Sequence, residues 1–589
     1  MAFCFPAVSS VSSYNLNVPG KFSKTGKPNL IVRGSLSNNC EKQSVALDKD
    51  TVLKSNLVKQ LKHPMGHPSV IEDIHVEHVR KLKAFKHMIG KIGEDSFEGL
   101  VIIDAVQRLG IDYHFQNEIQ QILRRQYVIS TSDSFQHHHC LQEISLRFRL
   151  LRQEGFNVPC DVFNRFTNED GKFNQRVKED INGLLDLYEA SQLCVEGEDV
   201  LDEARQFSSK LLNDSLTNLD DYQAEIVRNT LLYPYHRTLA RFVAKNFFLR
   251  YFQGENRWIN VFQDLAKMDF SLVQSLHQSE IVQISKWWKD LALAKKLKFA
   301  RDQPLKWYIW SMVCFTDANM SWQRIELTKP ICFIYIIDDI FDVYGTLDEL
   351  TIFTEIVKRW DHEAINQLPD YMKICFQILD NVTNEISYKV YKEQGFNPVH
   401  SLRKVWSSLC NAFLVEAKWF ADGSMPKAEE YLKNGIISSG IHVVLVHVFF
   451  LLGQNVTKET VQLIDNNPGI ISSTATILRL WDDLGSAEDE NQGGKDGSYV
   501  YYYMREHQVF DLKAAEKHTM DKISDAWMCL NKECVSSNPF SSSFIRVSLN
   551  LARMVPLIYS YDNNQRLLSL EKFIKSFLFE NEEPTQGVY

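Results

Sequence analysis

Apolar residues recur at intervals of three and four from about Val52 to the C-terminus, the spacing of one buried helix face. No stretch alternates apolar and polar residues between turn signals as paired strands do, and no fixed period indicates a solenoid. The 25 Gly and 16 Pro among 589 residues are few for a turn-rich β protein. A representative helical series is Leu100, Ile102, Ile103, Val106 and Leu109. The pattern therefore predicts an all-α protein.

Length and the distribution of tryptophan divide this helical chain. At 589 residues and 68.3 kDa, it is too long for one compact core. All 11 Trp lie from Trp258 onward, so we place a domain junction in the segment 256–283. We predict a segment 1–50 outside the fold, an N-terminal helical domain over 51–265 and a C-terminal helical domain over 266–589.

The first 40 residues differ in composition from the rest. They contain seven Ser, four Lys or Arg and no Asp or Glu, and the first acid is Glu41. Such a composition is typical of an organelle transit peptide, and no apolar run is long enough for a secretory signal. The serine content favours a plastid over a mitochondrion. We therefore predict a plastid protein, or a cytosolic one if this segment is not a transit peptide.

Charge and cysteine content exclude several partners. The net charge of −9 gives no basic excess for nucleic acid. The 11 Cys are scattered without a CxxC pair, which disfavours a zinc site or a disulfide framework. The most apolar stretch, 436–453, includes two serines and two histidines, so we expect a buried core helix and no membrane span.

Three acids follow a run of seven mostly apolar residues. On a helix, Asp338 and Asp342 lie one turn apart on one face, with Asp339 about 100° away. Gly345 is a helix stop, and Thr346–Glu349 has the spacing of a capping box for the next helix. Like charges at a helix C-terminus repel one another and the dipole, and divalent cations would reverse that cost. The alternative is an acidic helix end that faces water.

A second acidic segment spans residues 478–490. Asp482, Ser486 and Glu490 are spaced i, i+4, i+8, so one helix face carries two carboxylates and a hydroxyl. Arg479 lies one turn earlier on roughly the same side. Ligands that are all oxygen favour Mg²⁺ or Mn²⁺ over zinc. The alternative is a surface helix with scattered acids, but two such faces in one helical domain are much more specific together.

Two clusters of hard cations suit a polyphosphate ligand. No GxxxxGK[ST] loop is present, so a P-loop nucleotide site is not expected. A diphosphate leaving group held by several Mg²⁺ and an arginine fits better, because its neutralisation lowers the barrier to C–O ionisation. The other product would be a carbocation, which apolar and aromatic helices would shelter from water and stabilise by cation–π contacts.

With these features, the sequence resembles the plant terpene synthases of class I from about Leu57 to the C-terminus. The resemblance implies a C-terminal catalytic, metal-binding α-domain preceded by a helical-barrel domain without catalytic acids. No DxDD motif occurs in the first half, so protonation-initiated cyclisation is not implied. The matching stretches are the DDxxD acids, the DDxxSxxxE acids with Asp483, LLDLYEAS (184–191), RWD (359–361), EAKWF (416–420) and NLARMV (550–555).

The resemblance also assigns roles to the acids and to two arginines. It implies three Mg²⁺ per active site, with Mn²⁺ as the substitute, held by Asp338, Asp342, Asp482, Ser486 and Glu490, with Asp339 as a partial ligand. Together with Asp338, Asp342 and Asp482, Arg301 and Arg479 are implied to bind the substrate diphosphate. In the family's Arg-x-Arg motif, the second position here is Gln303, so one guanidinium is missing.

Further matches fall on residues for which ordinary packing is about as good an explanation. Trp310 matches an aromatic residue of the cation pocket, and Tyr335 shares a helix face with Asp338. Ser438 and Ser439 match a helix break whose carbonyls face the cation, and Tyr559 matches a pocket-lining tyrosine.

Two departures bear on the product. Many plastid monoterpene synthases carry Arg-Arg-x8-Trp near the mature N-terminus, and this chain has no Trp before Trp258. The pair Arg124 and Arg125 lies too far inside the chain to replace that motif. The late Asp-Gly-Tyr type loop is replaced by residues 560–564. With Gln303, these departures resemble the subfamily that makes acyclic alcohols such as linalool and nerolidol.

We therefore expect a monomer or weak homodimer that ionises geranyl diphosphate and captures the cation with water as linalool. Farnesyl diphosphate would give nerolidol by the same chemistry. Within the family, a sesquiterpene (nerolidol) synthase and a cyclising monoterpene synthase are the alternatives. A catalytically silent helical scaffold would explain the periodicity but not two acid-bearing faces.

Overall fold

The structure is a computed structural model that describes residues 68–90, 92, 96–130, 140–174, 179–241, 244, 257–297, 300–490, 497–536, 538–559 and 578. For residues 68–72, 257–260 and 486–490 it describes the backbone alone. The predicted transit segment 1–50 and the loop 560–564 lie outside the described residues.

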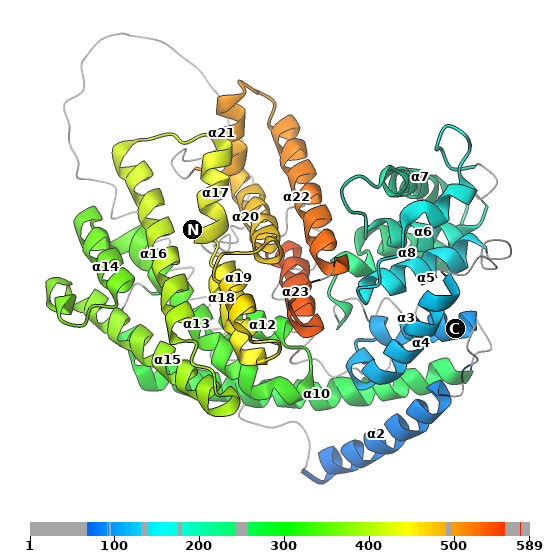
Figure 1. The fold of residues 1–589 in the computed structure, drawn as a ribbon, viewed down its shortest axis with the longest axis horizontal. Coiled ribbons are helices and arrows are strands. Elements are labelled where there is room, and N and C mark those ends of the chain that lie inside the picture. The colour runs from blue at the N-terminus through cyan, green and yellow to red at the C-terminus, as the bar shows by residue number, and fades with distance from the viewer. Residues whose placement is uncertain are drawn as a thin grey trace, which may run out of the picture. The chain divides into compact units, whose positions relative to one another are not determined.

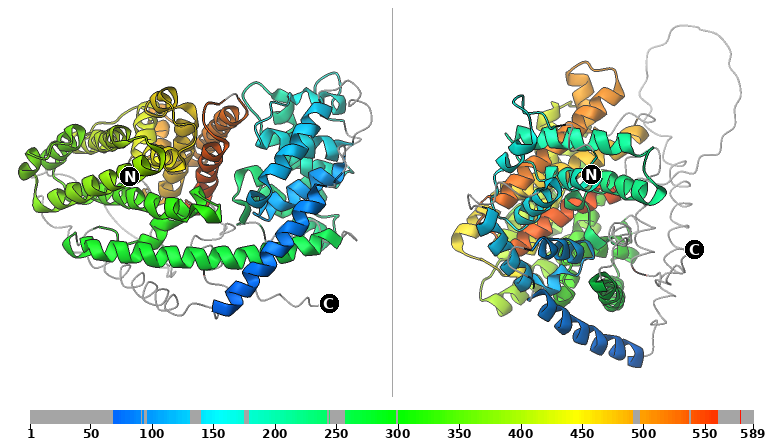
Figure 2. Two further views of the ribbon diagram at one scale, coloured as in Figure 1. Left: turned by 60° about the horizontal axis from the view of Figure 1, so that its bottom comes forward. Right: turned by 90° about the vertical axis from the view of Figure 1, so that its right-hand side faces the viewer.

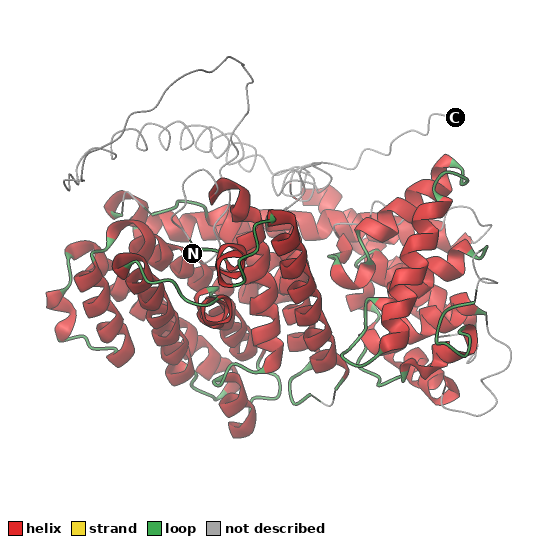
Figure 3. Ribbon diagram, turned by 90° about the horizontal axis from the view of Figure 1, so that it is seen from above, coloured by secondary structure: helices red, strands yellow, loops and turns green. Residues whose placement is uncertain are grey.

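The regular secondary structure of the described residues is helical, with loops between the helices, as Figure 3 shows, and an isolated β-bridge joins Thr167 and Phe173. This confirms the all-α prediction. The first group of helices comprises α2 (Pro68–Ile89), α3 (Phe97–Arg108), α4 (Gln116–Ser130), α5 (Leu141–Gln153), α6 (Ile181–Ser191), α7 (Asp199–Ser215) and α8 (Asp221–Leu232) (Figure 1). Short 3₁₀ turns cover Asp112–His114, Cys160–Phe166, Tyr235–Arg237, Ala318–Met320 and Ala364–Gln367.

The second group begins with a long helix and leads to the C-terminus. Its members are α10 (Arg257–Leu291), α11 (Leu293–Lys296), α12 (Pro304–Cys314), α13 (Ser321–Asp339), α14 (Leu347–Arg359), α15 (Asp370–Gln394), α16 (Val399–Asp422), α17 (Ala428–Ser438), α18 (Ile441–Leu452), α19 (Lys458–Ile464), α20 (Gly469–Glu490), α21 (Tyr499–Glu506), α22 (Leu512–Val535) and α23 (Ser542–Ile558).

Side-chain caps and an apolar core fix the first group of helices. The Ser96 hydroxyl accepts from the backbone N–H of Glu98 at the start of α3, and the Asp180 carboxylate accepts from that of Gly183 at the start of α6. The inward faces of α3, α5 and α6 then form one buried cluster that includes Leu150. This cluster is a buried apolar core beneath the first group of helices.

The long helix α10 joins the two groups. It runs without interruption across the predicted boundary at 265/266, and Figure 2 shows it extending beneath both groups. Phe262, near its start, packs into the first core. Glu280, further along, pairs with Arg324 of α13 at 2.7 Å, with both side chains fully buried. The position of the domain boundary stays a prediction.

The most apolar stretch is a core helix with a break. Among the described residues, 428–452 is the one helical stretch long and apolar enough to cross a membrane, and 83% of its most apolar window is buried inside the protein. Gly440 adopts φ +74° between α17 and α18, a left-handed conformation that glycine accepts without strain. His447 is buried, and its Nδ1–H donates to the Val443 carbonyl oxygen at 2.7 Å. These observations agree with the expected core helix.

The end of α13 differs from a regular helix. Residues Ile340–Tyr344 form a π-helical turn, a feature that is often found at functional sites. The helix stops at Gly345, whose N–H donates to the Ile340 carbonyl at 2.8 Å. Thr346 and Glu349 form the predicted capping box at the start of α14, with both reciprocal hydrogen bonds present. The stop and the cap together fix where the acid-bearing helix ends.

Candidate active site

Arg301 lies directly against the first two acids of α13. Its backbone N–H donates to Asp339 Oδ2 at 2.9 Å, and its guanidinium Nε lies 2.6 Å from Asp339 Oδ1. A second guanidinium nitrogen forms an ion pair with Asp338 and donates to the Tyr335 carbonyl at 3.2 Å. The structure therefore brings together an arginine and two carboxylates that lie almost 40 positions apart in the sequence.

The three acids of the DDxxD segment have different environments. Asp338 is fully buried, Asp339 is 8% exposed and Asp342 faces solvent. Burial raises the pKa of Asp339 to about 6, although Arg301 opposes the shift. The surrounding protein, together with the negative charges of Asp338 and Glu416, raises the pKa of Asp342 to about 7. These surroundings destabilise the ionised forms of Asp339 and Asp342, and a cation beside them would offset that cost.

The second acidic segment is built around buried Arg479. Arg479 is 2% exposed, and its Nη1 lies 3.3 Å from Asp482 Oδ2 and 3.7 Å from Asp483 Oδ1. Asp483 also accepts from the Tyr431 hydroxyl at 3.0 Å and from the Tyr499 backbone N–H at 2.9 Å. Asp483 is therefore fixed in place by neighbouring groups from two other helices.

The two acidic segments influence each other electrostatically. Burial raises the pKa of Asp482 to about 8, and the negative charges of Asp483 and Asp338 add to this shift. Helix α20 continues to Glu490, so Ser486 and Glu490 lie on the same helix at the predicted spacing, while their side chains lie outside the described atoms. An all-oxygen donor set of mutually destabilised carboxylates fits Mg²⁺ or Mn²⁺.

The helix break carries a polar network that the sequence reasoning missed. The Ser438 hydroxyl donates to Glu416 Oε1 at 2.6 Å and accepts from Arg479 Nη2 at 3.2 Å. Asn434 Nδ2 also donates to Glu416 Oε1 at 3.0 Å. Glu416 begins the EAKWF stretch, which carried the resemblance without a role for its acid. By contrast, the Ser439 hydroxyl bonds locally, donating to the Ile436 carbonyl at 2.8 Å.

Aromatic side chains form a buried wall beside the first acidic segment. Trp310 Nε1 donates to the Tyr335 hydroxyl at 3.1 Å, and both side chains are essentially fully buried. Trp307, which the sequence reasoning did not select, lies with its ring centroid 6.3 Å from that of Tyr335. The Arg301 guanidinium lies 5.0 Å from the Tyr335 ring centroid. The predicted pocket aromatics are thus in contact with the DDxxD region.

Tyr559 and Gln303 complete the predicted set. Tyr559 ends α23 and is 1% exposed, and a Cβ placed on Gly485 would lie 3.9 Å from its Cβ. Tyr559 therefore packs against α20 between Asp482 and Ser486 in sequence. Gln303 precedes α12, and its Oε1 is buried without a hydrogen-bond partner among the described residues.

Comparison with known proteins identifies the family. Residues 289–529 match the model of the terpene synthase family, metal binding domain, and residues 52–231 match that of the terpene synthase N-terminal domain. A probable terpene synthase from Ricinus communis is 60% identical over 513 residues, which cover 87% of this chain and 89% of the relative. The chain therefore belongs to the terpene synthase family of enzymes, and the predicted resemblance is confirmed.

Two further relatives carry more specific names. An (E)-nerolidol synthase from Cannabis sativa is 56% identical over 82% of this chain and 88% of the relative. The chloroplastic S-(+)-linalool synthase from Arabidopsis thaliana is 47% identical over 85% of this chain and 88% of the relative. Among solved structures, isoprene synthase from grey poplar with three Mg²⁺ ions and dimethylallyl-S-thiolodiphosphate is 35% identical, with a TM-score of 0.77 over 87% of this chain and 96% of that one.

Proposed function

We propose that this enzyme ionises geranyl diphosphate and captures the resulting cation with water as linalool, with farnesyl diphosphate giving nerolidol in the same pocket. The proposal rests on the proximity of two groups of acids, two arginines and a set of buried aromatic side chains. Acids at the end of α13 and on α20 influence each other's pKa, Arg301 and Arg479 contact those acids, and a buried aromatic wall adjoins them.

The acids would hold three Mg²⁺ ions. We assign them to Asp338, Asp342, Asp482, Ser486 and Glu490, with Asp339 as a partial ligand held by Arg301. When bound, Mg²⁺ supplies neutralisation of the diphosphate leaving group.

The remaining roles fall on side chains of this chain. Arg301 and Arg479 would donate hydrogen bonds to diphosphate oxygens, since a guanidinium matches their geometry. Trp310 and Tyr335 would face the allylic cation and exclude bulk water. A single admitted water would then form a C–O bond with the tertiary carbon of the cation and give up its proton to the released diphosphate. Ser438, Ser439 and Tyr559 would line the opposite part of the pocket.

The acyclic product rests on the sequence departures and on the relatives. This chain lacks Arg-Arg-x8-Trp, and relatives named linalool and nerolidol synthases are 47% and 56% identical to it. A chloroplastic tricyclene synthase from Antirrhinum majus is also 47% identical, and this relative supports the alternative of a cyclising monoterpene synthase. The absence of Arg-Arg-x8-Trp favours the acyclic product over the cyclic one.

Product analysis by gas chromatography tests the proposal. The purified enzyme is incubated with geranyl and farnesyl diphosphate separately, with Mg²⁺ present or chelated. We expect linalool and nerolidol, and a mainly cyclic profile would refute the acyclic product. Asp338→Ala should abolish turnover while its circular dichroism spectrum keeps the helical signal, and unchanged activity in that variant would refute the assignment of the metal site.

Plastid import, domain limits and assembly belong to the same proposal. Relatives including the linalool synthase are named chloroplastic, and the first 40 residues of the segment 1–50 have a transit-like composition. A fluorescent protein fused after residue 50 should enter plastids, and cytosolic fluorescence would contradict this. We place the non-catalytic domain at 51–265 and the catalytic one at 266–589, and we expect a monomer or weak homodimer in light scattering.

A further inference from the structure

A cavity lies away from both acidic segments, between the first group of helices and α23. Its volume is about 180 Å³, close to that of roughly six liquid waters. Its wall includes the 3₁₀ turn Tyr235–Arg237 on one side and α12 and α23 on the other. None of the residues assigned above to metal, diphosphate or cation lines it. It is therefore a separate feature of the molecule.

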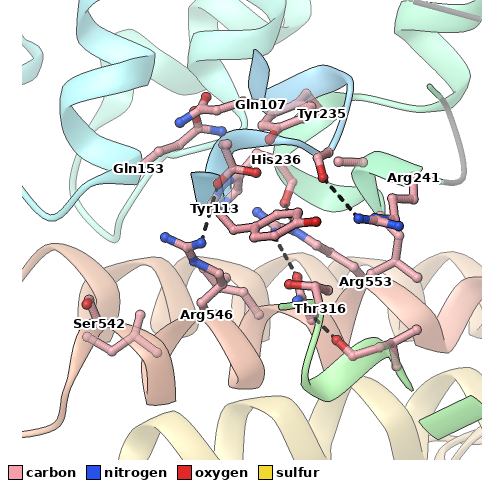
Figure 4. Close-up of a pocket in the computed structure, with 18 of the residues that line it drawn as sticks. Gln107, Tyr113, Gln153, Tyr235, His236, Arg241, Thr316, Ser542, Arg546 and Arg553 are labelled. Carbon is pink, nitrogen blue, oxygen red and sulfur yellow. Dashed lines mark hydrogen bonds and ion pairs between the residues drawn. The ribbon is translucent and has the colours of Figure 1, made fainter. Parts of the chain in front are cut away.

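Three arginines line this cavity. Arg546 and Arg553 are seven positions apart on α23 and so share a helix face, and Arg241 reaches in from another segment. Figure 4 shows the three side chains around Tyr113. The Arg241 guanidinium lies 5.9 Å from the Tyr113 ring centroid. Such a convergence of guanidinium groups is the usual recognition element for oxyanions.

Two of the three arginines already form an ion pair with a carboxylate, and each pairs through one guanidinium nitrogen. Asp112 lies 3.3 Å from Arg546 Nη1, and Arg241 Nη2 donates to Asp269 Oδ2 at 2.9 Å. Glu154 accepts from Gln120 at 2.9 Å, and burial raises the pKa of its carboxyl, which disfavours its anionic form.

Arg553 consequently has no anion of its own. Its Nε donates to the His236 carbonyl at 2.8 Å and its Nη1 to Asn550 Oδ1 at 3.0 Å, and both acceptors are neutral. It forms no ion pair with any carboxylate in the described part of the chain. Burial lowers the pKa of this guanidinium, the sign of a charge that lacks compensation. Arg241 adds a buried Nη1 that has no hydrogen-bond partner among the described residues.

His236 presents an acceptor at the same cavity. Asn531 Nδ2 donates to the carbonyls of Gln192 and Cys194 at 3.0 and 2.9 Å, so its Oδ1 must be the atom that faces His236 Nε2 at 2.8 Å. Nε2 therefore carries the proton, and burial lowers the pKa of the ring to about 3, which keeps it neutral. Nδ1 of this 1% exposed histidine is an acceptor without a hydrogen-bond partner among the described residues.

The cavity thus offers cationic donors together with buried acceptors, His236 Nδ1 and Gln107 Oε1, that have no hydrogen-bond partner among the described residues. A fully deprotonated anion such as sulfate or acetate would satisfy the arginines but has no proton for His236 Nδ1. Hydrogen phosphate carries both acceptor oxygens and an O–H donor, and hydrogen diphosphate shares this chemistry. We propose that a protonated phosphate-class anion binds in this cavity, where Arg553, Arg241 and Arg546 donate hydrogen bonds to its oxygens and His236 Nδ1 accepts a hydrogen bond from its O–H group.

The contacts of Arg553 connect this site to the aromatic wall. Asn550, which accepts from Arg553, donates through Nδ2 to the Val313 carbonyl at 3.1 Å. Val313 lies one turn after Trp310 on α12. The NLARMV stretch therefore links the first group of helices, the cavity and α12, and a bound anion would tighten that link.

Isothermal titration calorimetry of the full-length protein with inorganic phosphate tests the proposal. A chelator removes Mg²⁺ and no prenyl substrate is added. The outcome is therefore independent of the proposed reaction. We expect one phosphate per chain, with sulfate at equal ionic strength binding at least tenfold more weakly. Arg553→Gln and Arg546→Gln should each raise the phosphate Kd about tenfold or more, the loss expected for one charge-assisted hydrogen bond.

Arg228→Gln is the matched control, because Arg228 is half exposed on α8, pairs with Glu225 at 3.4 Å and lies outside the cavity. It should bind phosphate as the unmodified protein does. Absence of phosphate binding, equal binding of sulfate, or unmodified binding in both cavity variants would overturn the proposal. A parallel titration with diphosphate separates the sources: tighter binding than phosphate supports the site as one for the released product, and weaker binding supports it as one for free phosphate.

Discussion

Ser438 and Ser439 are adjacent, equally buried and next to the break between α17 and α18, yet their hydroxyls have different hydrogen-bond partners. Ser438 bridges Glu416 and Arg479, both charged, at 2.6 and 3.2 Å. Ser439 donates to the Ile436 carbonyl at 2.8 Å and accepts from the Ile441 N–H at 3.3 Å. Replacing each serine by alanine therefore separates the positioning of Arg479 from the maintenance of the helix break.

The hydrogen-bond partners set the expected magnitudes. A hydrogen bond to a charged group contributes about 1.5–3 kcal/mol, and one between neutral groups about 0.5–1.5 kcal/mol. Ser438→Ala removes two charged bonds, of which the one to Arg479 orients a group assigned to the diphosphate. We expect kcat/KM to fall by roughly 10–100-fold, since about 1.4 kcal/mol corresponds to a factor of ten. Ser439→Ala should lower stability by about 1 kcal/mol and leave kcat/KM within about threefold.

Steady-state assays of diphosphate release at saturating Mg²⁺, with thermal unfolding of both variants, measure this contrast. The kinetic comparison is made well below the unfolding temperature, so lost stability cannot imitate lost catalysis. Equal losses of kcat/KM in the two variants, or a Ser438→Ala enzyme with unmodified kcat/KM, would refute the positioning role of Ser438.

Three further changes probe other parts of the molecule. Trp310→Phe keeps a ring face and should retain most of kcat, whereas Trp310→Leu should lower kcat by about 3–30-fold, the range for a cation–π contact of about 0.5–2 kcal/mol. Assays of diphosphate release measure both variants. A Leu variant as fast as the Phe variant contradicts a cation-stabilising role for Trp310. Arg324→Met leaves Glu280 buried without its main partner and should cost about 3–5 kcal/mol in thermal unfolding, so a loss below about 1 kcal/mol would be inconsistent with that pair. Burial lowers the pKa of His442 and of His447 from 6.5 to about 4; because the unfolded chain binds these protons first, stability is complete above pH 6.5 and falls by about 1.4 kcal/mol per histidine per pH unit down to pH 4. One proton corresponds to about 1.4 kcal/mol per pH unit, so unfolding measured at pH 7.5 and 5.5 should show this slope. His442→Gln should remove about one proton from it, and an unchanged slope in that variant speaks against the assignment.

Features that depend on local spacing could be predicted from the sequence. The 3.6-residue period predicts the helices, and the stop and capping box at residues 345–349 follow from residue type and order alone. The i, i+4 and i, i+8 positions on α20 are equally local, because one helix carries all of them. Each of these inferences needs only the geometry of a single helix.

Features that depend on distant segments could not be predicted in this way. Asp339 meets Arg301 across 38 positions, and Ser438 meets Glu416 across 22, so only the packing of separate helices brings them together. The π-helical turn Ile340–Tyr344 is also invisible to periodicity, since a single wide turn does not change the apolar pattern. Arg553 belongs to a stretch recognised by resemblance, but its contact with His236 shows a structural link between helix groups.

Both arginines assigned to the diphosphate contact carboxylates assigned to the metals. Arg301 pairs with Asp338 and Asp339, and Arg479 lies 3.3 Å from Asp482. Under the proposed function, cations that take these carboxylate oxygens would compete with the guanidinium groups for them, and each arginine displaced in this way becomes available to diphosphate oxygens. This exchange explains how an acidic chain can bind an anionic substrate. It also explains why carboxylates with raised pKa values can persist at the site, because the arginines limit their repulsion until metal and substrate arrive together.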